Sequence, residues 1–194
     1  MAHRFSHAIA EGDGISVIAA VDDPESAKAA EEQRAEALVV RANPAHLRDA
    51  TSLPILWRAD VSLDEASVAA DAYLIVFDSF DDDDGRLEAL HQRALELGLD
   101  CAVEVRNEED LEQALDRVDP EIFLLSPAEA EDGETPLETV LGLLAAVPAG
   151  KLAIADLPLT TRDEVLELER AGCDAVIVHG PDVAPLAGGP PPLV

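Results

Sequence analysis

The sequence predicts an α/β fold, a compact single-domain (β/α)8 barrel, and two features of the chain lead to this prediction. Eight short runs of mostly Val, Ile, Leu and Ala recur along the 194 residues, and stretches with helical spacing separate them. The runs are almost continuously apolar, as in strands that are covered on both faces. Because the units are regular and eight in number, closure into a barrel is favoured over an open sheet.

Each apolar run predicts one strand. In chain order the runs are ISVIAAV from Ile15, EALVVRA from Glu36, PILWRAD from Pro54, AYLIVFD from Ala72, CAVEVRN from Cys101, EIFLLSP from Glu121, KLAIADL from Lys151 and AVIVHG from Ala175. The chain is shorter than the ~250 residues typical of a TIM barrel, so its loops must be shortened. We expect one domain over residues 1–194, with a short N-terminal segment at 1–14 and a Gly/Pro-rich tail at 187–194.

Start and stop signals mark the helices between these runs. A hydroxyl residue followed three positions later by Glu predicts a capping box at three places: Ser62 with Glu65, Thr135 with Glu138, and Thr161 with Glu164. Asn107 is expected to cap an acidic first turn, and Gly98 and Gly172 to end helices. The clearest helical spacing lies in residues 86–97 and 108–118.

The chain is strongly acidic. Its 41 Asp and Glu against 13 Lys and Arg give a formal net charge of −28, which argues against nucleic acid and anionic membranes as partners. No run approaches the ~20 apolar residues of a membrane span, so a soluble, cytoplasmic protein is expected. Halophilic adaptation and descent from an acidic proteome rich in Ala and Arg explain the charge equally well. The sequence does not indicate an oligomeric state.

The two cysteines, Cys101 and Cys173, precede apolar runs and are expected to be buried structural thiols. Without CxxC spacing they make no metal cage. The acidic run at 81–84 is best explained as the solvated start of a helix. We therefore predict neither a metal nor a cofactor.

Polar side chains at the predicted C-terminal ends of the strands form the candidate site, because barrel active sites are built at that end. Glu104 and Arg58 are the candidate catalytic residues. The candidate ligand-binding residues are Asp22, Arg41, Asp78, Arg106, Ser126, Asp156 and His179. Such a mixture serves acid–base chemistry, holds a divalent ion or satisfies itself as ion pairs, and the residues alone leave these alternatives open.

Four segments carry a resemblance to a known family. They are FSHAIAEGDGISVIAAVD from Phe5, LPILWR from Leu53, LGLDCAVEVRNEEDLEQAL from Leu97 and TRDEVLELERAGCDAVIV from Thr161. In this order the chain resembles indole-3-glycerol-phosphate synthase, a carboxy-lyase of tryptophan biosynthesis among the ribulose-phosphate-binding barrels. The third segment is the most specific, because the family has a VEV strand followed by an acidic-capped helix at this place.

The resemblance also implies that much of the family's chemistry is missing. The general-acid lysine of the family corresponds to Arg58, whose guanidinium is a very poor proton donor at neutral pH. The family's glutamate in the VEV strand is kept as Glu104. The Glu and Lys of the first strand correspond to Ala20 and Asp22, and the Asn-Asn-Arg-Asp run is replaced by residues 125–128.

The family's phosphate clamp and lid are altered as well. Phosphate binding in these barrels uses backbone N–H groups after the seventh and eighth strands. Pro158 and Pro181 each remove such a donor, and Asp182 adds a repelling charge, so a standard clamp is not expected. By the resemblance, we expect the family's N-terminal extension to be reduced to one or two helical turns before Gly14, with the loss of part of its lid.

Three functions follow, in descending order of expectation. The first is a synthase-like barrel that has lost the standard reaction and binds a partner or a small ligand, for example an anionic or sugar-phosphate compound. The second is a divergent indole-3-glycerol-phosphate synthase. The third is an enzyme of another class that uses the acid and arginine cluster at the mouth.

Overall fold

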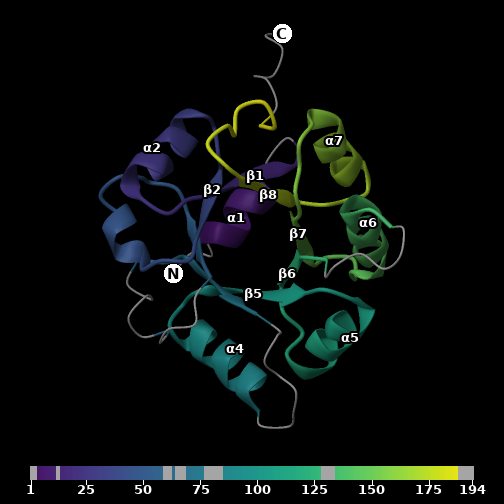
Figure 1. Cartoon of the computed structure of the whole chain (residues 1–194). Helices are drawn as coiled ribbons and strands as arrows, with labels where there is room; N and C mark the ends of the chain where they lie inside the picture. The colour runs from purple at the N-terminus through teal and green to yellow at the C-terminus, as the bar shows by residue number, and fades with distance from the viewer. Residues whose placement is uncertain are drawn as a thin grey trace.

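The computed structural model of the protein is a closed barrel of eight parallel strands, with helices around it (Figure 1). The structure describes residues 4–11, 14–58, 63, 69–76, 85–127 and 134–187. The strands pair in sequence order, and the last pairs in parallel with the first, with Ile18 opposite Ile177. The predicted fold class, a single-domain (β/α)8 barrel, is confirmed.

All eight strands fall on the predicted apolar runs, although β5 begins one residue earlier than expected. The strands are β1 Ser16–Ala20, β2 Ala37–Val40, β3 Ile55–Trp57, β4 Ala72–Ile75, β5 Asp100–Val105, β6 Ile122–Leu125, β7 Leu152–Asp156 and β8 Ala175–His179. The helices are α1 Arg4–Ala10, α2 Pro24–Glu32, the 3-10 helix η1 Pro44–Leu47, α4 Arg86–Glu96, α5 Glu108–Arg117, α6 Pro136–Ala146 and α7 Arg162–Arg170. No helix in these described segments is long and apolar enough to cross a bilayer.

The predicted start and stop signals position the helices. Two of the three capping boxes are confirmed, at Thr135 and Thr161, where each hydroxyl accepts a hydrogen bond from the backbone N–H three residues on. The third, at Ser62, lies outside the described residues. Gly98 and Gly172 follow α4 and α7 with φ of 74° and 94°, a left-handed conformation that glycine adopts without steric cost.

A helix after every strand was expected, and after β2 this prediction is wrong. Residues 41–54 form only the single turn η1, which Pro44 starts and the Asn43 side chain caps. The rest of the connection is held against α2, because the hydroxyls of Thr51 and Ser52 donate to Glu31. These bonds fix the end of the connection beside α2.

The described residues after β8 also form turns in place of a helix. Pro181 and Pro185 provide no backbone N–H, which disfavours a helix there. Val183 and Leu186 are buried, and the backbone N–H of Val183 donates to the Gln33 side chain at 2.7 Å. This segment lies between α2 and α7 and closes the outer layer (Figure 1).

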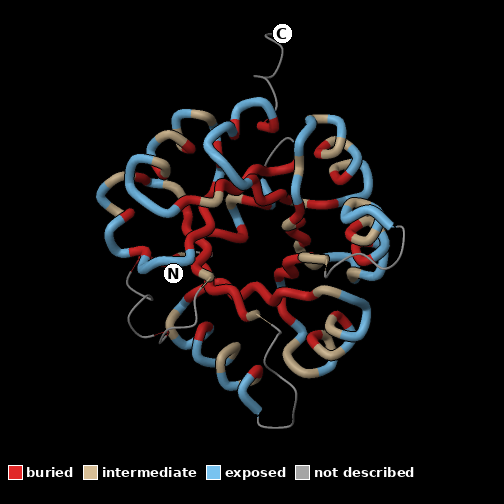
Figure 2. The backbone as a smooth tube through the Cα atoms, in the orientation of Figure 1, coloured by how far each residue is buried: buried red, intermediate tan, exposed pale blue. Residues whose placement is uncertain are grey.

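The core has two layers, one inside the barrel and one between the sheet and the helices. Alternating strand residues such as Ile18, Leu56 and Ile154 fill the interior. Their neighbours, among them Trp57, pack outward against the helices, as predicted for this tryptophan. Figure 2 shows the buried residues as a ring formed by the strands and on the inward sides of the helices.

Helix α1 closes the N-terminal end of the barrel. Phe5 and Ile9 are buried in the interior cluster with the strand residues. The backbone N–H of Ser6 donates to the side chain of Asp100, the first residue of β5, at 2.8 Å. The N-terminal segment is therefore a plug at the end of the barrel opposite the candidate site.

Both thiols are buried, as predicted, and are expected to be unreactive. Burial raises the pKa of Cys101 and of Cys173 to about 12, so neither forms a thiolate at neutral pH. A disulfide reagent such as dithionitrobenzoate should label neither cysteine in the native protein and both in denaturant. Native labelling at the rate of free cysteine is the result that contradicts this expectation.

Candidate functional site

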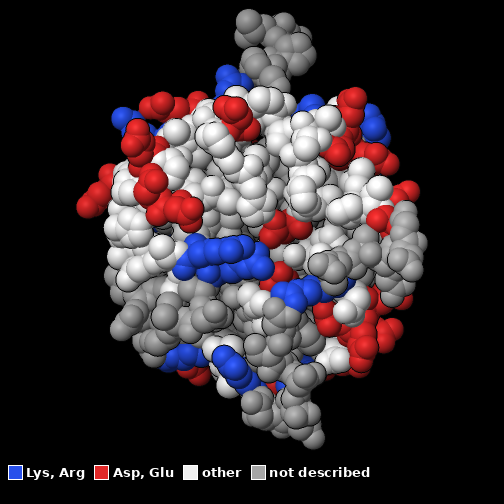
Figure 3. Space-filling model, viewed as in Figure 1, with Lys and Arg blue, Asp and Glu red and all other residues white. Residues whose placement is uncertain are grey.

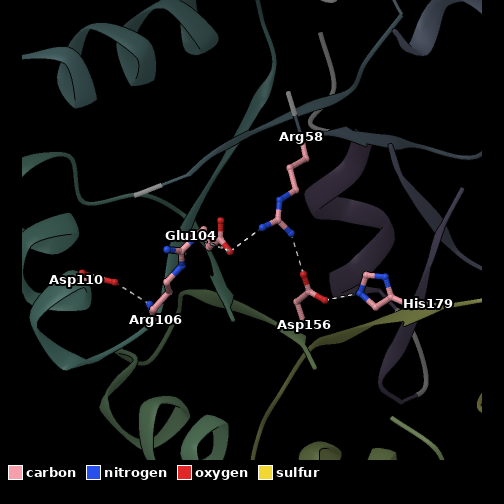
Figure 4. A network of polar contacts seen from close by, with 6 residues as sticks. All are labelled: Arg58, Glu104, Arg106, Asp110, Asp156 and His179. Atoms are coloured by element: carbon pink, nitrogen blue, oxygen red, sulfur yellow. Dashed lines mark hydrogen bonds and ion pairs between the residues drawn. The ribbon is translucent and has the colours of Figure 1, made fainter. Parts of the chain in front are cut away.

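Four side chains from four strands form a continuous polar chain across the C-terminal mouth of the barrel (Figure 4). Arg58 follows β3 and donates from Nη2 to Oε1 of Glu104 at 2.9 Å and from Nη1 to Oδ2 of Asp156 at 3.0 Å. The other oxygen of Asp156 lies 2.6 Å from Nε2 of His179. One guanidinium thus joins two carboxylates, and the second carboxylate holds a histidine.

The two-residue period of the strands explains why these side chains meet. On β5, Ala102 lies in the interior cluster, so Glu104 also faces inward, one layer closer to the mouth. On β7 the same alternation takes Ile154 in the interior to Asp156 at the mouth. His179 ends β8, which pairs next to β7.

Glu104 is a fully buried carboxylate, 0% exposed. Its Oε1 also lies 3.8 Å from Nη2 of Arg106, and its Oε2 accepts no hydrogen bond from any described residue. Burial raises the pKa of Glu104, and the charge of Arg58 and the nearby Ser126 hydroxyl oppose that rise only in part. The ion pair with Arg58 is therefore what keeps a charge tolerable at this depth.

Asp156 and His179 form a second pair, and the pKa shifts of both residues favour their charged forms. Burial alone raises the pKa of Asp156, but the hydrogen bond with His179 and the charges of His179 and Arg58 outweigh it, and the net shift is downward from 3.8. The hydrogen bond to Asp156 raises the pKa of His179 above 6.5. The ion pair therefore stabilises the fold at pH values between the two pKa values. This stabilisation is lost as the pH falls through the pKa of Asp156 or rises through the pKa of His179.

A pocket of about 290 Å³ opens beside this polar chain, towards β1, β2 and β8. It is lined by Ala20, Val21, Asp22, Val39, Arg41, Arg58, Asp156, Ile177, His179 and Gly180. Basic side chains gather at the centre of this face beside a few acidic ones, whereas most of the visible acidic side chains lie towards the edge (Figure 3). The ion pairs thus leave a pocket open at the mouth of the barrel.

The structure brings most of the predicted site residues together. Those that line the pocket are Asp22, Arg41, Arg58, Asp156 and His179. Three others, Glu104, Arg106 and Ser126, lie on the far side of the Arg58 guanidinium from His179. Asp78 lies outside the described residues. Within the described ranges no group of three or more His, Cys, Asp or Glu side chains is placed to hold a metal ion.

Sequence reasoning did not identify the apolar floor of the pocket. Ala20, Val39 and Ile177 occupy interior positions of three neighbouring strands. The two-residue alternation along each strand could have identified them, because each lies two positions before a polar residue of the mouth. Arg106 was predicted and is fixed by the turn that follows it: its backbone N–H donates to Asp110 at 2.9 Å, where Asn107 caps α5 as expected.

Curated relatives point to one family. Indole-3-glycerol phosphate synthase from Geobacillus sp. (strain WCH70) is 31% identical over 138 residues, which cover 68% of this chain and 52% of that protein. The protein of the same name from Lachnospira eligens is 32% identical over 143 residues, with 68% and 52% covered. The chain spans about half the length of the curated relatives it matches.

Solved structures support the same architecture. The N-acetylmannosamine-6-phosphate 2-epimerase from Clostridium perfringens matches with a TM-score of 0.71 at 13% identity, covering 89% of this chain and 88% of that one. A mutant tryptophan synthase alpha-subunit from Pyrococcus furiosus matches with a TM-score of 0.65 at 16% identity, covering 84% and 86%. At such identities the likeness shows the fold alone.

The family itself is shown by a sequence model. The model of the indole-3-glycerol phosphate synthase family matches residues 16–181, from the start of β1 to just beyond β8. This range includes every strand of the barrel and all four residues of the polar chain. The chain therefore belongs to the indole-3-glycerol phosphate synthase family.

Proposed function

We propose that this barrel binds a small anionic ligand, such as a sugar phosphate, in the mouth pocket and does not perform the synthase reaction. The observation that carries the proposal is the position of Arg58, which corresponds to the family's general-acid lysine. Its guanidinium is held between Glu104 and Asp156 at 2.9 and 3.0 Å. A guanidinium in this arrangement keeps its proton at neutral pH and cannot replace the lysine as a general acid.

The distribution of charge supports an anionic ligand. Only 13 of the 194 residues are Lys or Arg, yet Arg41, Arg58 and Arg106 all lie at the mouth, together with His179. Arg41 lines the pocket, and its charge acts on both Glu104 and His179. A guanidinium suits a carboxylate or phosphate because its N–H groups match two oxygens at once.

The loss of the synthase reaction follows from acid–base chemistry. The reaction needs a proton donor at the position that Arg58 occupies, and a guanidinium stays protonated throughout the neutral range. Glu104 is the family glutamate, but one of its oxygens is bound to Arg58. Neither half of the family's acid–base machinery is therefore available in its usual form.

Two backbone donors of the loop after β7 are already bonded within the protein. Oε2 of Glu164 accepts hydrogen bonds from the backbone N–H groups of Thr160 and Thr161 at 2.9 and 2.8 Å. A carboxylate of the protein thus occupies the N-terminus of α7, which would otherwise attract an anion. The ligand's charge is therefore expected beside Arg41.

Calorimetric titration with ribose 5-phosphate and with inorganic phosphate tests the proposal. Wild-type protein should bind the sugar phosphate, and Arg41→Gln should weaken binding by about tenfold or more, the effect of one charge-assisted hydrogen bond. Arg93→Gln is the matched control, because Arg93 is an exposed arginine of α4 that pairs with Glu96. Absence of binding, or equal binding by both variants, contradicts the proposal.

A divergent synthase is the second candidate, and the retained Glu104 favours it. This candidate requires the bound compound to be converted to product, whereas the binding proposal requires that it be released unchanged. An enzyme of another class is the third candidate, and the pair of Asp156 and His179 favours that one.

A further inference from the structure

His179 has one ring nitrogen committed and one available. Nε2 lies 2.6 Å from Oδ1 of Asp156, whereas Nδ1 makes no hydrogen bond to a described residue. The side chain is 50% exposed and lines the pocket. Asp156 is 9% exposed and is fixed from its other side by Arg58 at 3.0 Å. A buried, anchored carboxylate thus orients an imidazole whose free nitrogen is accessible to a ligand.

We propose that His179 and Asp156 form an acid–base dyad that moves a proton on a small anionic carbonyl compound bound in the mouth pocket. This inference rests on the proposed anion site and adds a reaction to it. Asp156 holds the tautomer with the proton on Nε2, which leaves the lone pair on Nδ1 to act as the base. Asp156 is therefore a positioning residue for His179.

The proton transfer needs no further reactant. Nδ1 takes a proton from the carbon next to the substrate carbonyl, the C–H electron pair forms a C=C bond, and the π pair of the carbonyl moves onto its oxygen to give an enolate. The imidazolium then returns a proton to the same carbon. Where that carbon carries a hydroxyl, a proton passes from this hydroxyl to the enolate oxygen, and the imidazolium protonates the former carbonyl carbon. Return of the proton to the same carbon exchanges hydrogen with the solvent, and return to the neighbouring carbon isomerises the compound.

The charges around His179 suit both states of this cycle. Asp156 of β7 stabilises the imidazolium, and its hydrogen bond raises the pKa of His179 against burial and the charges of Arg41 and Arg58. Arg41 and Arg58 lie on the wall towards β2 and β3, where they stabilise the negative enolate. Asp22, after β1, is the remaining charged group that lines the pocket.

The size of the pocket restricts the substrate. Its volume of about 290 Å³ lies at the lower end of ligand pockets, which span roughly 300–1,000 Å³. A compound of a few carbons therefore fits, with a carbonyl near Arg58 and a carboxylate or a phosphate near Arg41. The anionic group of the substrate is a carboxylate or a phosphate, and the experiment has one arm for each.

Hydrogen–deuterium exchange tests the dyad. Protein in D2O is incubated with 2-oxobutyrate in one arm and with dihydroxyacetone phosphate in the other, and proton NMR follows the loss of the C–H signal. In at least one arm wild-type protein should exceed the protein-free rate. His179→Gln should remove that gain, about 10²- to 10⁴-fold for a general base, at compound concentrations that calorimetry shows to saturate the variant.

Asp156→Asn separates positioning from packing. An asparagine can still accept a hydrogen bond from Arg58, but it presents an N–H to His179 and favours the wrong tautomer, so exchange should fall at temperatures where the variant is fully folded. The pH profile of the remaining exchange should shift to lower pH, because the carboxylate that raises the His179 pKa is gone. A purely structural pair predicts no change in the profile.

Each outcome decides one claim. Binding of a carbonyl compound without exchange above the buffer rate overturns the dyad and leaves the anion site standing. Exchange that His179→Gln does not reduce also overturns it. If neither compound binds, the anion site fails and the dyad fails with it.

Discussion

Arg58→Met is expected to destabilise the fold by about 3 kcal/mol at pH 7, because removing one partner of a buried ion pair leaves the other charge uncompensated. Arg58 is 19% exposed and is the cation nearest to Glu104, which is fully buried. Asp156 loses a hydrogen bond in the same variant. Urea unfolding followed by circular dichroism at several pH values measures the effect.

The pH dependence identifies the cause. Burial already raises the pKa of Glu104, and loss of Arg58 removes the main opposing charge, so the folded variant binds a proton more tightly than the unfolded chain. The loss in free energy of unfolding is therefore largest above the raised pKa of Glu104, and it becomes smaller as the pH falls through that pKa. Arg106→Met is the control, since its contact with Glu104 is 3.8 Å, and should cost less. A deficit that does not vary with pH contradicts this account.

Phe5→Ala is expected to cost about 3–5 kcal/mol, the range for truncating a fully buried aromatic side chain. Phe5 is 0% exposed and fills the N-terminal end of the barrel interior. Because α1 has only seven residues, the plug cannot shift to fill the cavity without losing Ile9 and the bond from Ser6 to Asp100. The measurement is the free energy of unfolding in urea.

His7→Ala provides the matched control within the same helix. His7 is exposed and pairs with Glu11 at the surface, so its loss should change stability by less than about 0.5 kcal/mol. Ligand binding at the mouth should survive in Phe5→Ala, since the plug and the pocket lie at opposite ends. Equal stability of the two variants contradicts the assignment of α1 as a plug.

The strands and most helix boundaries were predictable because their signals are local. A strand covered on both faces must be apolar along its length, and a capping box such as Thr161 with Glu164 needs only adjacent residues. The turns after β2 were missed for the opposite reason. The path of residues 41–54 is fixed partly by bonds from Thr51 and Ser52 to Glu31 of α2, which join residues that are distant in the sequence.

The candidate site divides in the same way. The ends of the strands were predictable, so Glu104, Asp156 and His179 were correctly placed at one rim. Ion pairing, including that of Glu104 with Arg58 or Arg106, was one of the alternatives the sequence left open. The partners could not be chosen, because Arg58 reaches residues 46 and 98 positions away in the sequence. Which acid it contacts is set by strand register around the closed barrel and by side-chain conformation, and neither leaves a mark in a single sequence.

The proposed function requires a barrel mouth that binds an anion but lacks the synthase's proton donor. The most direct test is incubation of purified wild-type protein with 1-(2-carboxyphenylamino)-1-deoxyribulose 5-phosphate, with indoleglycerol phosphate followed by fluorescence. We predict that no indoleglycerol phosphate forms above background, although the same protein preparation binds ribose 5-phosphate. Steady formation of indoleglycerol phosphate that Glu104→Gln abolishes is the result that contradicts the account.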